Sequence, residues 1–332
     1  MRFLIIQTAS IGDVILATPI IEKLHRFFPG SQIDFLLKAG NESLFKGHPF
    51  LNKIIIWDKK ESKYRQFVGI LKEIRAKQYD RVINVQRFGS SGLLTSLSNA
   101  NYTVGFDKNP FSLFFSTRIK HLITDKTSTP HEIERNLSLI AGFTDSSIVK
   151  PCLYPTLADQ QAVENFKVKP YFCIAPASLW FTKQFPADFW ADFLSKASAK
   201  FTGYLLGSAS DNELCEYIIK KSGNIRAVNL TGKLSLLQTA VLMQDAVMNF
   251  VNDSAPMHLA SAMNSPVSAI FCSTIPAFGF GPLSDDSAIV ETTTPLACKP
   301  CGLHGLQSCP KKHFRCATTI KTEQLLLRLP HD

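Results

Sequence analysis

The chain has 332 residues, which is more than one hydrophobic core usually holds and suits two domains of about 150 residues each. Apolar residues make up 45% and charged residues 19%, a balance that excludes a mostly disordered or fibrous chain. Lysine and arginine number 36 against 27 aspartates and glutamates, and the net charge of +9 favours an acidic partner such as a nucleotide, a phospholipid, a phosphorylated glycan or a nucleic acid.

The first half of the chain alternates predicted strands and helices. Continuous apolar runs predict buried parallel strands at 3–6, 32–37, 53–57 and 81–85. Helical spacing of apolar residues predicts helices at 14–28 and 64–77. Pro19 should bend the first of these helices near its start. The alternation is typical of a doubly wound parallel sheet.

The alternation is weaker between 109 and 169, where Pro151 and Pro155 mark an expected linker, and it resumes in the second half. Predicted strands lie at 171–175, 204–206, 228–230, 247–251 and 267–271. Predicted helices begin near 188 and 212 and cover 236–244, 257–263 and 322–329. We therefore expect two Rossmann-like domains, residues 1–160 and 161–332.

Polar residues follow two strands of the first half, at the sheet edge where doubly wound folds bind their ligands. Gly12 and Asp13 come after the first strand, and Gln86 and Arg87 come after the fourth. The carboxylate of Asp13 could cap the next helix, or it could act on a ligand as a general base.

The second half repeats this arrangement. Ser178 and Lys183 follow its first strand, and a hydroxyl with an ammonium group suits a diphosphate. Small polar residues at 252–258 precede a helix whose first N–H groups could bind an anion, with His258 as either a packed side chain or a phosphate donor. Asp211 follows the next strand and could hold ribose hydroxyls or cap a helix.

Several well-known nucleotide motifs are absent. Neither Gly-x-Gly-x-x-Gly nor Gly-x-x-x-x-Gly-Lys-Ser/Thr occurs, which weighs against a dinucleotide or P-loop site. The sequence has no Asp-x-Asp, which weighs against a metal ion that bridges a diphosphate. No recognition module for nucleic acid accompanies the positive charge, so we expect no nucleic-acid partner.

Four of the eight cysteines lie near the C-terminus, in the pattern Cys298-x2-Cys301-x7-Cys309-x6-Cys316. The first pair has the spacing of many structural zinc sites, and His304 and His313 could replace a cysteine as ligand. Reduced thiols and disulfides are the alternatives. In each case the cysteines would staple a loop and take no part in catalysis.

Four segments in order resemble one family, the glycosyltransferases of the ADP-heptose:lipopolysaccharide heptosyltransferase type (family 9). The segments are SIGDVILATP at 10–19, TKQFP at 182–186, LTGKLSLLQTAVLM at 230–243 and FVNDSAPMHLASAMNSPVSAIF at 250–271. Their order and separation fit the family over nearly the whole chain. One departure is Ala255, where the family usually has glycine.

The resemblance implies a GT-B fold, with two doubly wound Rossmann-like domains facing a cleft. It implies that residues 1–160 bind the acceptor and residues 161–332 the nucleotide sugar. It also implies an inverting transfer that needs no catalytic cofactor, with Asp13 as the general base. The other implied site residues are Ser178, Lys183, Ser254, Ala255 and His258 at the donor diphosphate, Asp211, Gly232, Lys233 and Asp253 at the nucleoside, and Gly12, Gln86 and Arg87 at the acceptor.

From this resemblance we expect an ADP-sugar donor and a lipopolysaccharide or other glycan acceptor. One alternative is the same fold with another nucleotide sugar or acceptor, such as O-antigen, capsule or protein. Another is a protein that binds a nucleotide sugar without catalysis.

We expect a cytoplasmic enzyme in peripheral contact with the inner face of the inner membrane. The apolar N-terminus is interrupted by Asp13 and lacks a small-residue cleavage site, so we expect residue 1 to be the mature start. Residues 38–87 carry twelve lysines and arginines against five acidic residues, which suits anionic lipid as well as a solvated surface. Three phenylalanines, Phe111, Phe114 and Phe115, could enter the membrane interface or form part of the core.

Overall fold

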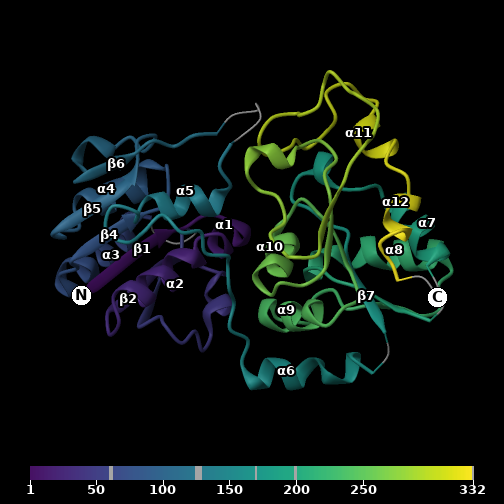
Figure 1. Cartoon of the computed structure of the whole chain (residues 1–332), viewed down its shortest axis with the longest axis horizontal. Helices are drawn as coiled ribbons and strands as arrows, with labels where there is room; N and C mark the ends of the chain where they lie inside the picture. The colour runs from purple at the N-terminus through teal and green to yellow at the C-terminus, as the bar shows by residue number, and fades with distance from the viewer. Residues whose placement is uncertain (60–62, 124–128, 169, 198–199, 331–332) are drawn as a thin grey trace. The chain divides into compact units, whose positions relative to one another are not determined.

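The computed structural model of the protein describes residues 1–59, 63–123, 129–168, 170–197 and 200–330. The chain forms two compact units, residues 1–123 with 129–154 and residues 155–330 (Figure 1). The division between Tyr154 and Pro155 falls at the end of the expected linker. A division at 160/161 would instead cut helix α6 (Leu157–Val163), which belongs to the second unit.

The first unit is built on a parallel sheet of six strands in the order β3-β2-β1-β4-β5-β6. The strands are β1 (Arg2–Gln7), β2 (Gln32–Lys38), β3 (Lys53–Trp57), β4 (Arg81–Asn84), β5 (Tyr102–Phe106) and β6 (Thr117–Ile119). The helices are α1 (Ile11–Ile15), α2 (Thr18–Phe27), α3 (Lys63–Lys77), α4 (Gly89–Ser96) and α5 (Glu132–Ser138), with 3₁₀ turns η1 (Glu42–Phe45) and η2 (Ser112–Phe114). The central strand β1 is almost entirely buried, as its apolar run predicts.

The second unit has a parallel sheet of the same kind, in the order β12-β11-β10-β7-β8-β9. The strands are β7 (Tyr171–Ala175), β8 (Thr202–Leu205), β9 (Ala227–Asn229), β10 (Asn249–Asn252), β11 (Val267–Ile270) and β12 (Ser287–Val290). Besides α6, the helices are α7 (Ala187–Lys196), α8 (Asn212–Ser222), α9 (Leu236–Gln244), α10 (Ala255–Ala262), α11 (Arg315–Thr318) and α12 (Glu323–Leu326). The 3₁₀ turns are η3 (Glu164–Phe166), η4 (Phe181–Lys183), η5 (Ala209–Asp211) and η6 (Pro276–Phe278).

The two sheets share one topological feature that positions the site. In each unit the first strand pairs with the fourth, β1 with β4 and β7 with β10. The strand order reverses at this pair, so the loops that follow the two strands run to opposite faces of the sheet. The carboxyl ends of β1, β4, β7 and β10 are therefore where a doubly wound fold leaves room for a ligand.

Two of the predicted helices differ in the structure. The single helix expected at 14–28 is two helices, α1 and α2. Pro19 does not bend a continuous helix; it stands in the first turn of α2, where its missing N–H has no partner to lose. The helix expected at 322–329 is the short α12, which is tied to α7 by the Thr322 hydroxyl donating to Asp192 at 2.6 Å.

Strands β5 and β6 were not predicted, because neither has a continuous apolar run. Strand β12 was missed although Ala288–Val290 are apolar, since that run is only three residues long. In β5 the glycine at position 105 is required by packing, since a Cβ there would lie 2.6 Å from the ring of Phe115. In the part of the chain that the structure describes, no helix has the length and apolar character to cross a bilayer.

Candidate functional site

Asp13 lies in the first helical turn after β1. The N–H of Ser10 donates to Asp13 Oδ2 at 3.2 Å, and the Ser10 hydroxyl donates to the same oxygen at 2.5 Å. Ser10 is thus the N-cap and Asp13 is the third helical residue of a capping box. Both bonds use Oδ2, and the described residues offer no hydrogen bond to Oδ1. One oxygen of the half-buried carboxylate can therefore still accept a proton from a ligand.

Gln86 lies beside this loop, because β4 pairs with β1. Its amide nitrogen donates to the side-chain oxygen of Gln7, and Thr8 Oγ1 donates to Gln86 Oε1 at 3.2 Å. Gln86 is buried, and its two hydrogen bonds tie the end of β4 to the end of β1. Arg87, the next residue, is exposed, whereas Gly12 is buried in α1. The structure thus brings Gln86 to the β1 loop and leaves Arg87 accessible to an anion.

A buried ion pair on α5 adjoins Asp13 and was missed by the sequence analysis. Arg135 Nε donates to Glu132 Oε2 at 2.7 Å, and the two residues are 4% and 7% exposed. Burial raises the pKa of Glu132, the charge of Arg135 opposes that rise, and the negative charge of Asp13 adds to it. The three-residue spacing of Glu132 and Arg135 was the available sign of this pair.

His121 is a second buried group in this region. Burial first, and then the positive charges of Arg87 and Arg135, lower its pKa to about 4. The imidazole is therefore neutral at pH 7, and the positive charge around it comes from the two guanidinium groups. Positive charge can hold an anionic ligand, and a carboxylate can take a proton from a hydroxyl of that ligand.

In the second unit Lys183 and Asp253 form an ion pair. Lys183 Nζ lies 2.7 Å from Asp253 Oδ2, and their side chains are only 15% and 8% exposed. Thr274 Oγ1 donates to the same carboxylate oxygen at 2.6 Å. The structure thus joins a residue expected at the diphosphate with one expected at the nucleoside. The partly buried ammonium group is held in one place, at the end of β10.

Asn252, the first residue of the predicted polar segment 252–258, holds the loops after β7 and β10 together. Its side chain is fully buried. Nδ2 donates to the carbonyl of Pro176 at 2.6 Å, and Oδ1 accepts from the N–H of Phe185 at 3.0 Å. The segment 176–185, which carries Lys183, is therefore fixed at both ends by one amide on the neighbouring strand.

Helix α10 begins next to this ion pair. Ser254 is its N-cap residue, but the Ser254 side chain makes no capping bond to the helix; it donates to the carbonyl of Asn252 at 3.4 Å. Ala255 and Pro256 form the first turn, and His258 is buried one turn further. Pro256 has no N–H, and the Met257 N–H donates to the carbonyl of Ser254 at 3.0 Å. The uncapped helix start therefore offers an anion the Ala255 N–H and the positive end of the helix.

Ser178 lies on the β7 side of this region. It is half-buried, and its carbonyl accepts from Gln184 Nε2 at 2.7 Å, which leaves its hydroxyl on a loop of fixed shape.

The loops after β8 and β9 also lie together. The Gly232 N–H donates to the carbonyl of Gly207 at 3.0 Å, and Gly232 has φ +69°, with Ala209 only 2.9 Å from where its Cβ would be. Asp211 Oδ2 accepts the Ser208 N–H and hydroxyl, each at 2.7 Å, which closes a capping box on the 3₁₀ turn η5. The Asp211 side chain makes no capping bond to the next helix, α8, whose N-cap position it occupies. Lys233 Nζ donates to the carbonyl of Asn229 at 2.8 Å.

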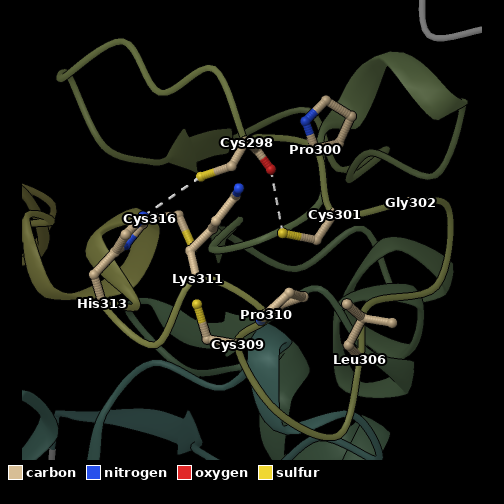
Figure 2. A pocket seen from close by; sticks show the side chains of 10 residues that line it. All are labelled: Cys298, Pro300, Cys301, Gly302, Leu306, Cys309, Pro310, Lys311, His313 and Cys316. Atoms are coloured by element: carbon tan, nitrogen blue, oxygen red, sulfur yellow. Dashed lines mark hydrogen bonds between the residues drawn. The ribbon is translucent and has the colours of Figure 1, made fainter.

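The C-terminal cysteines surround a cavity of about 250 Å³. Figure 2 shows their sulfur atoms turned toward one space, with His313 at its side. Cys301 Sγ lies 3.2 Å from the Cys298 carbonyl, and Cys298 Sγ lies 3.8 Å from His313 Nε2. All eight cysteines are free thiols, so the disulfide alternative is not what the structure contains. The residues that line the cavity are Cys298, Pro300, Cys301, Gly302, Leu306, Cys309, Pro310, Lys311, His313 and Cys316.

The thiols of this cluster affect one another. Burial raises the pKa of Cys316 to about 11, with Cys301 and Cys309 as further causes. Burial also raises the pKa of Cys301, and Cys298 and Cys309 add to that rise. As the side chains stand, no three His, Cys, Asp or Glu groups among the described residues converge on one metal position. The donor atoms are thus of a kind that binds metal and line one cavity, but they do not form a metal-binding group as they stand.

Known proteins with the same architecture were found by comparison. Residues 68–305 match the family model of glycosyltransferase family 9 (heptosyltransferase). The chain is 24% identical to lipopolysaccharide heptosyltransferase 1 of Pseudomonas aeruginosa over 341 residues, covering 98% of this chain and 93% of that protein. E. coli ADP-heptose lps heptosyltransferase II superposes with a TM-score of 0.79 at 20% identity, over 99% of this chain and 97% of that one.

A more distant structure is TibC of enterotoxigenic E. coli, an iron-containing dodecameric glycosyltransferase. It superposes with a TM-score of 0.56 at 16% identity, over 98% of this chain and 74% of that one. Together with the strand orders, these likenesses confirm the predicted GT-B fold of two Rossmann-like domains.

Proposed function

Because the chain belongs to glycosyltransferase family 9 (heptosyltransferase), we propose that it transfers a heptose from ADP-heptose to an acceptor of the lipopolysaccharide inner core, with inversion at the anomeric carbon. One observation carries the proposal. In the first unit, the carboxylate of Asp13 lies where the strand order reverses and has one available oxygen. In the second unit, the ammonium group of Lys183 is fixed at the corresponding place, beside the uncapped start of α10. A glycosyl transfer needs these two groups, a base for the acceptor and a cationic site for the diphosphate.

The first unit supplies the acceptor chemistry in this proposal. Oδ1 of Asp13 takes the proton from the acceptor hydroxyl, while the capping bonds to Oδ2 keep the carboxylate oriented. The acceptor oxygen, as it loses this proton, attacks the anomeric carbon from the face opposite ADP. The bond from that carbon to the phosphate oxygen then breaks. Arg87, with Gly12 and Gln86 shaping the loop, binds the anionic part of the acceptor.

The second unit supplies the donor site. Lys183, the Ala255 N–H at the start of α10, and the hydroxyls of Ser178 and Ser254 stabilise the negative charge that the leaving diphosphate acquires. These groups provide electrostatically what a bridging metal ion would provide, and so we propose a transfer without a catalytic metal.

Further residues of this unit complete the donor site in the proposal. His258 adds a donor from α10, and Asp253 holds Lys183 in place through the 2.7 Å ion pair. Asp211, Gly232 and Lys233 lie in the joined loops after β8 and β9, where a nucleoside would bind.

A surface of the first unit suits an anionic membrane. Phe88, Leu113 and Phe114 are 61%, 75% and 70% exposed, whereas Phe115 is buried and belongs to the core. The ring of Phe111 lies 6.5 Å from that of Phe114 and 3.6 Å from where a Cβ on Gly89 would be, which joins the two loops. The exposed cations in the same stretch are Lys108, Arg118 and Lys120. We propose that this apolar tip makes peripheral contact with the inner membrane, on its cytoplasmic side.

We also propose that the C-terminal cysteines bind a structural metal ion. The support is the gathering of four thiols around one cavity. Cys298, Cys301, Cys309 and Cys316 would hold the ion, which would tie the 298–316 segment into one unit and take no part in the transfer.

Replacing Asp13 by asparagine should lower kcat about 10²- to 10⁴-fold, because the amide cannot accept a proton. The Kd for ADP should change less than about twofold. The checks are initial rates with ADP-heptose and a lipopolysaccharide precursor, and calorimetry with ADP. Asp159→Asn is the matched control, because Asp159 accepts the same pair of capping bonds from Thr156 in α6. Turnover that survives in Asp13→Asn would show that another group is the base.

Lys183→Ala should weaken binding of ADP about 10- to 100-fold, since a charge-assisted contact to the diphosphate is lost. Binding of adenosine, which has no phosphate, should stay within about twofold. Calorimetric titrations with the two ligands measure this ratio. Lys196→Ala, which removes an exposed lysine paired with Asp192, should leave both affinities unchanged. Equal weakening of both ligands would place Lys183 away from the diphosphate.

Leu113→Ser combined with Phe114→Ser should reduce binding to vesicles that contain phosphatidylglycerol about tenfold, because apolar area no longer enters the bilayer. Flotation with such vesicles and with pure phosphatidylcholine measures the effect. Leu157→Ser is the control, since Leu157 is 68% exposed in the second unit. No difference between the double variant and wild type would rule out the tip as the contact.

Protein purified without added metal should contain about one equivalent of metal per chain by elemental analysis. Because the similar TibC is iron-containing, iron is measured together with zinc. Cys309→Ser should lower the content and the melting temperature, whereas Cys152→Ser, outside the cluster, should change neither. Wild-type protein free of bound metal would contradict the proposal and leave the cysteines as reduced thiols.

A further inference from the structure

Residues 298–316, here called the cysteine segment, line the cysteine cavity and also contact η4, the turn that carries Lys183. Thr182, in the middle of η4, is 1% exposed. Its N–H donates to the carbonyl of Leu306 at 3.0 Å, and its Oγ1 accepts from the N–H of Leu306 at 2.8 Å. Leu306 itself lines the cysteine cavity (Figure 2), so one residue belongs to the cavity wall and to the support of η4.

A second contact reaches the other member of the ion pair. The Ser273 hydroxyl donates to Thr182 Oγ1 at 2.9 Å, and the Ser273 carbonyl accepts from the N–H of Cys301 at 2.8 Å. Ser273 is fully buried and precedes Thr274, whose hydroxyl bonds Asp253. The hydroxyl of Thr182 is thus shared by the cysteine segment and by the loop that supports Asp253.

The same segment also touches Lys183 directly. Gly305 has φ +77°, and a Cβ on it would lie 2.8 Å from Lys183 Cγ. The glycine therefore lets the backbone of the segment lie against the aliphatic part of the lysine side chain. Further along, the rings of Phe181 and Phe314 stack with centroids 5.2 Å apart. Residues 305–314 thus contact all three residues of η4, Phe181, Thr182 and Lys183.

We propose that Thr182 is a positioning residue, through which the cysteine segment holds Lys183 and Asp253 in the arrangement that binds the donor diphosphate. The inference rests on the proposed donor site, and it assigns the cysteine segment a part in donor affinity. Thr182 does not touch the donor; it acts through Lys183. Loss of its hydroxyl would leave the Leu306 N–H and the Ser273 hydroxyl buried without their acceptor, and η4 would shift.

The test compares Thr182→Val, which keeps the shape and removes the hydroxyl, with Thr182→Ser, which keeps the hydroxyl. Thr182→Val should raise the Kd for ADP about tenfold and the Kd for adenosine less than about twofold, and Thr182→Ser should restore ADP binding to within about twofold of wild type. Thr322→Val is the control, because it removes an equally buried hydroxyl from the same unit. Calorimetry on the full chain gives each constant.

A double-mutant cycle tests whether Thr182 acts through Lys183. Thr182→Val combined with Lys183→Ala should bind ADP no more weakly than Lys183→Ala alone. If the two losses in ADP affinity multiply in the double variant, the two residues act independently and Thr182 does not act through Lys183. If Thr182→Val does not fold, as judged by circular dichroism, Gly305→Ala replaces it, because its new Cβ would lie 2.8 Å from Lys183 Cγ and displace that side chain. Gly305→Ala should then weaken ADP binding and spare adenosine.

The outcomes separate the two proposals. If wild type binds ADP no more tightly than adenosine, or if Lys183→Ala leaves ADP binding unchanged, the proposed donor site fails. If Lys183→Ala weakens ADP binding selectively while Thr182→Val and Gly305→Ala bind ADP as wild type does, the donor site holds and the positioning role of Thr182 is wrong.

Discussion

The reversal of strand order beside the first strand of each sheet is the constraint on which the site depends. The loops after β1 and β4, and those after β7 and β10, run to opposite faces of their sheet. The carboxyl ends of these strands are therefore left uncovered between the two loops. Polar groups that would be costly in the core therefore collect at these ends. Asp13 and Gln86 do so in one unit, and Lys183 with Asp253 in the other. The chemistry follows from topology that both units share.

The buried network around Lys183 shows why such a site needs support beyond the groups that meet a ligand. An ammonium group that is 15% exposed is stable only while its carboxylate partner and the surrounding hydrogen bonds stay in place. Asn252 fixes the segment from the side of β10, and Thr182 fixes it from the side of the cysteine segment. The two supports explain how a turn of three residues can hold a charge in a defined position.

The parts that could be predicted from the sequence are those with a local cause. Buried runs such as Tyr171–Ala175 predict parallel strands, and the cysteine spacing predicts that these side chains gather in one place. The contacts of Thr182, Asn252 and the Glu132–Arg135 pair depend on which distant segments meet, and no local pattern encodes them. Strand β5 was missed for a related reason, since its glycine is explained only by the ring of Phe115 packed against it.

The same capping arrangement occurs in both units. It shows how Asp13 can cap a helix and still have an oxygen available to act as a base. Ser10 with Asp13, and Ser208 with Asp211, each direct a backbone N–H and a hydroxyl to one carboxylate oxygen. A carboxylate held through one oxygen has lost its rotational freedom but keeps lone pairs on the other. In the proposed reaction, capping prepares Asp13 for proton transfer, because a base acts efficiently only when its accepting atom is already oriented toward the hydroxyl. Under that proposal the helix cap and the general base are two uses of one side chain, divided between its two oxygens.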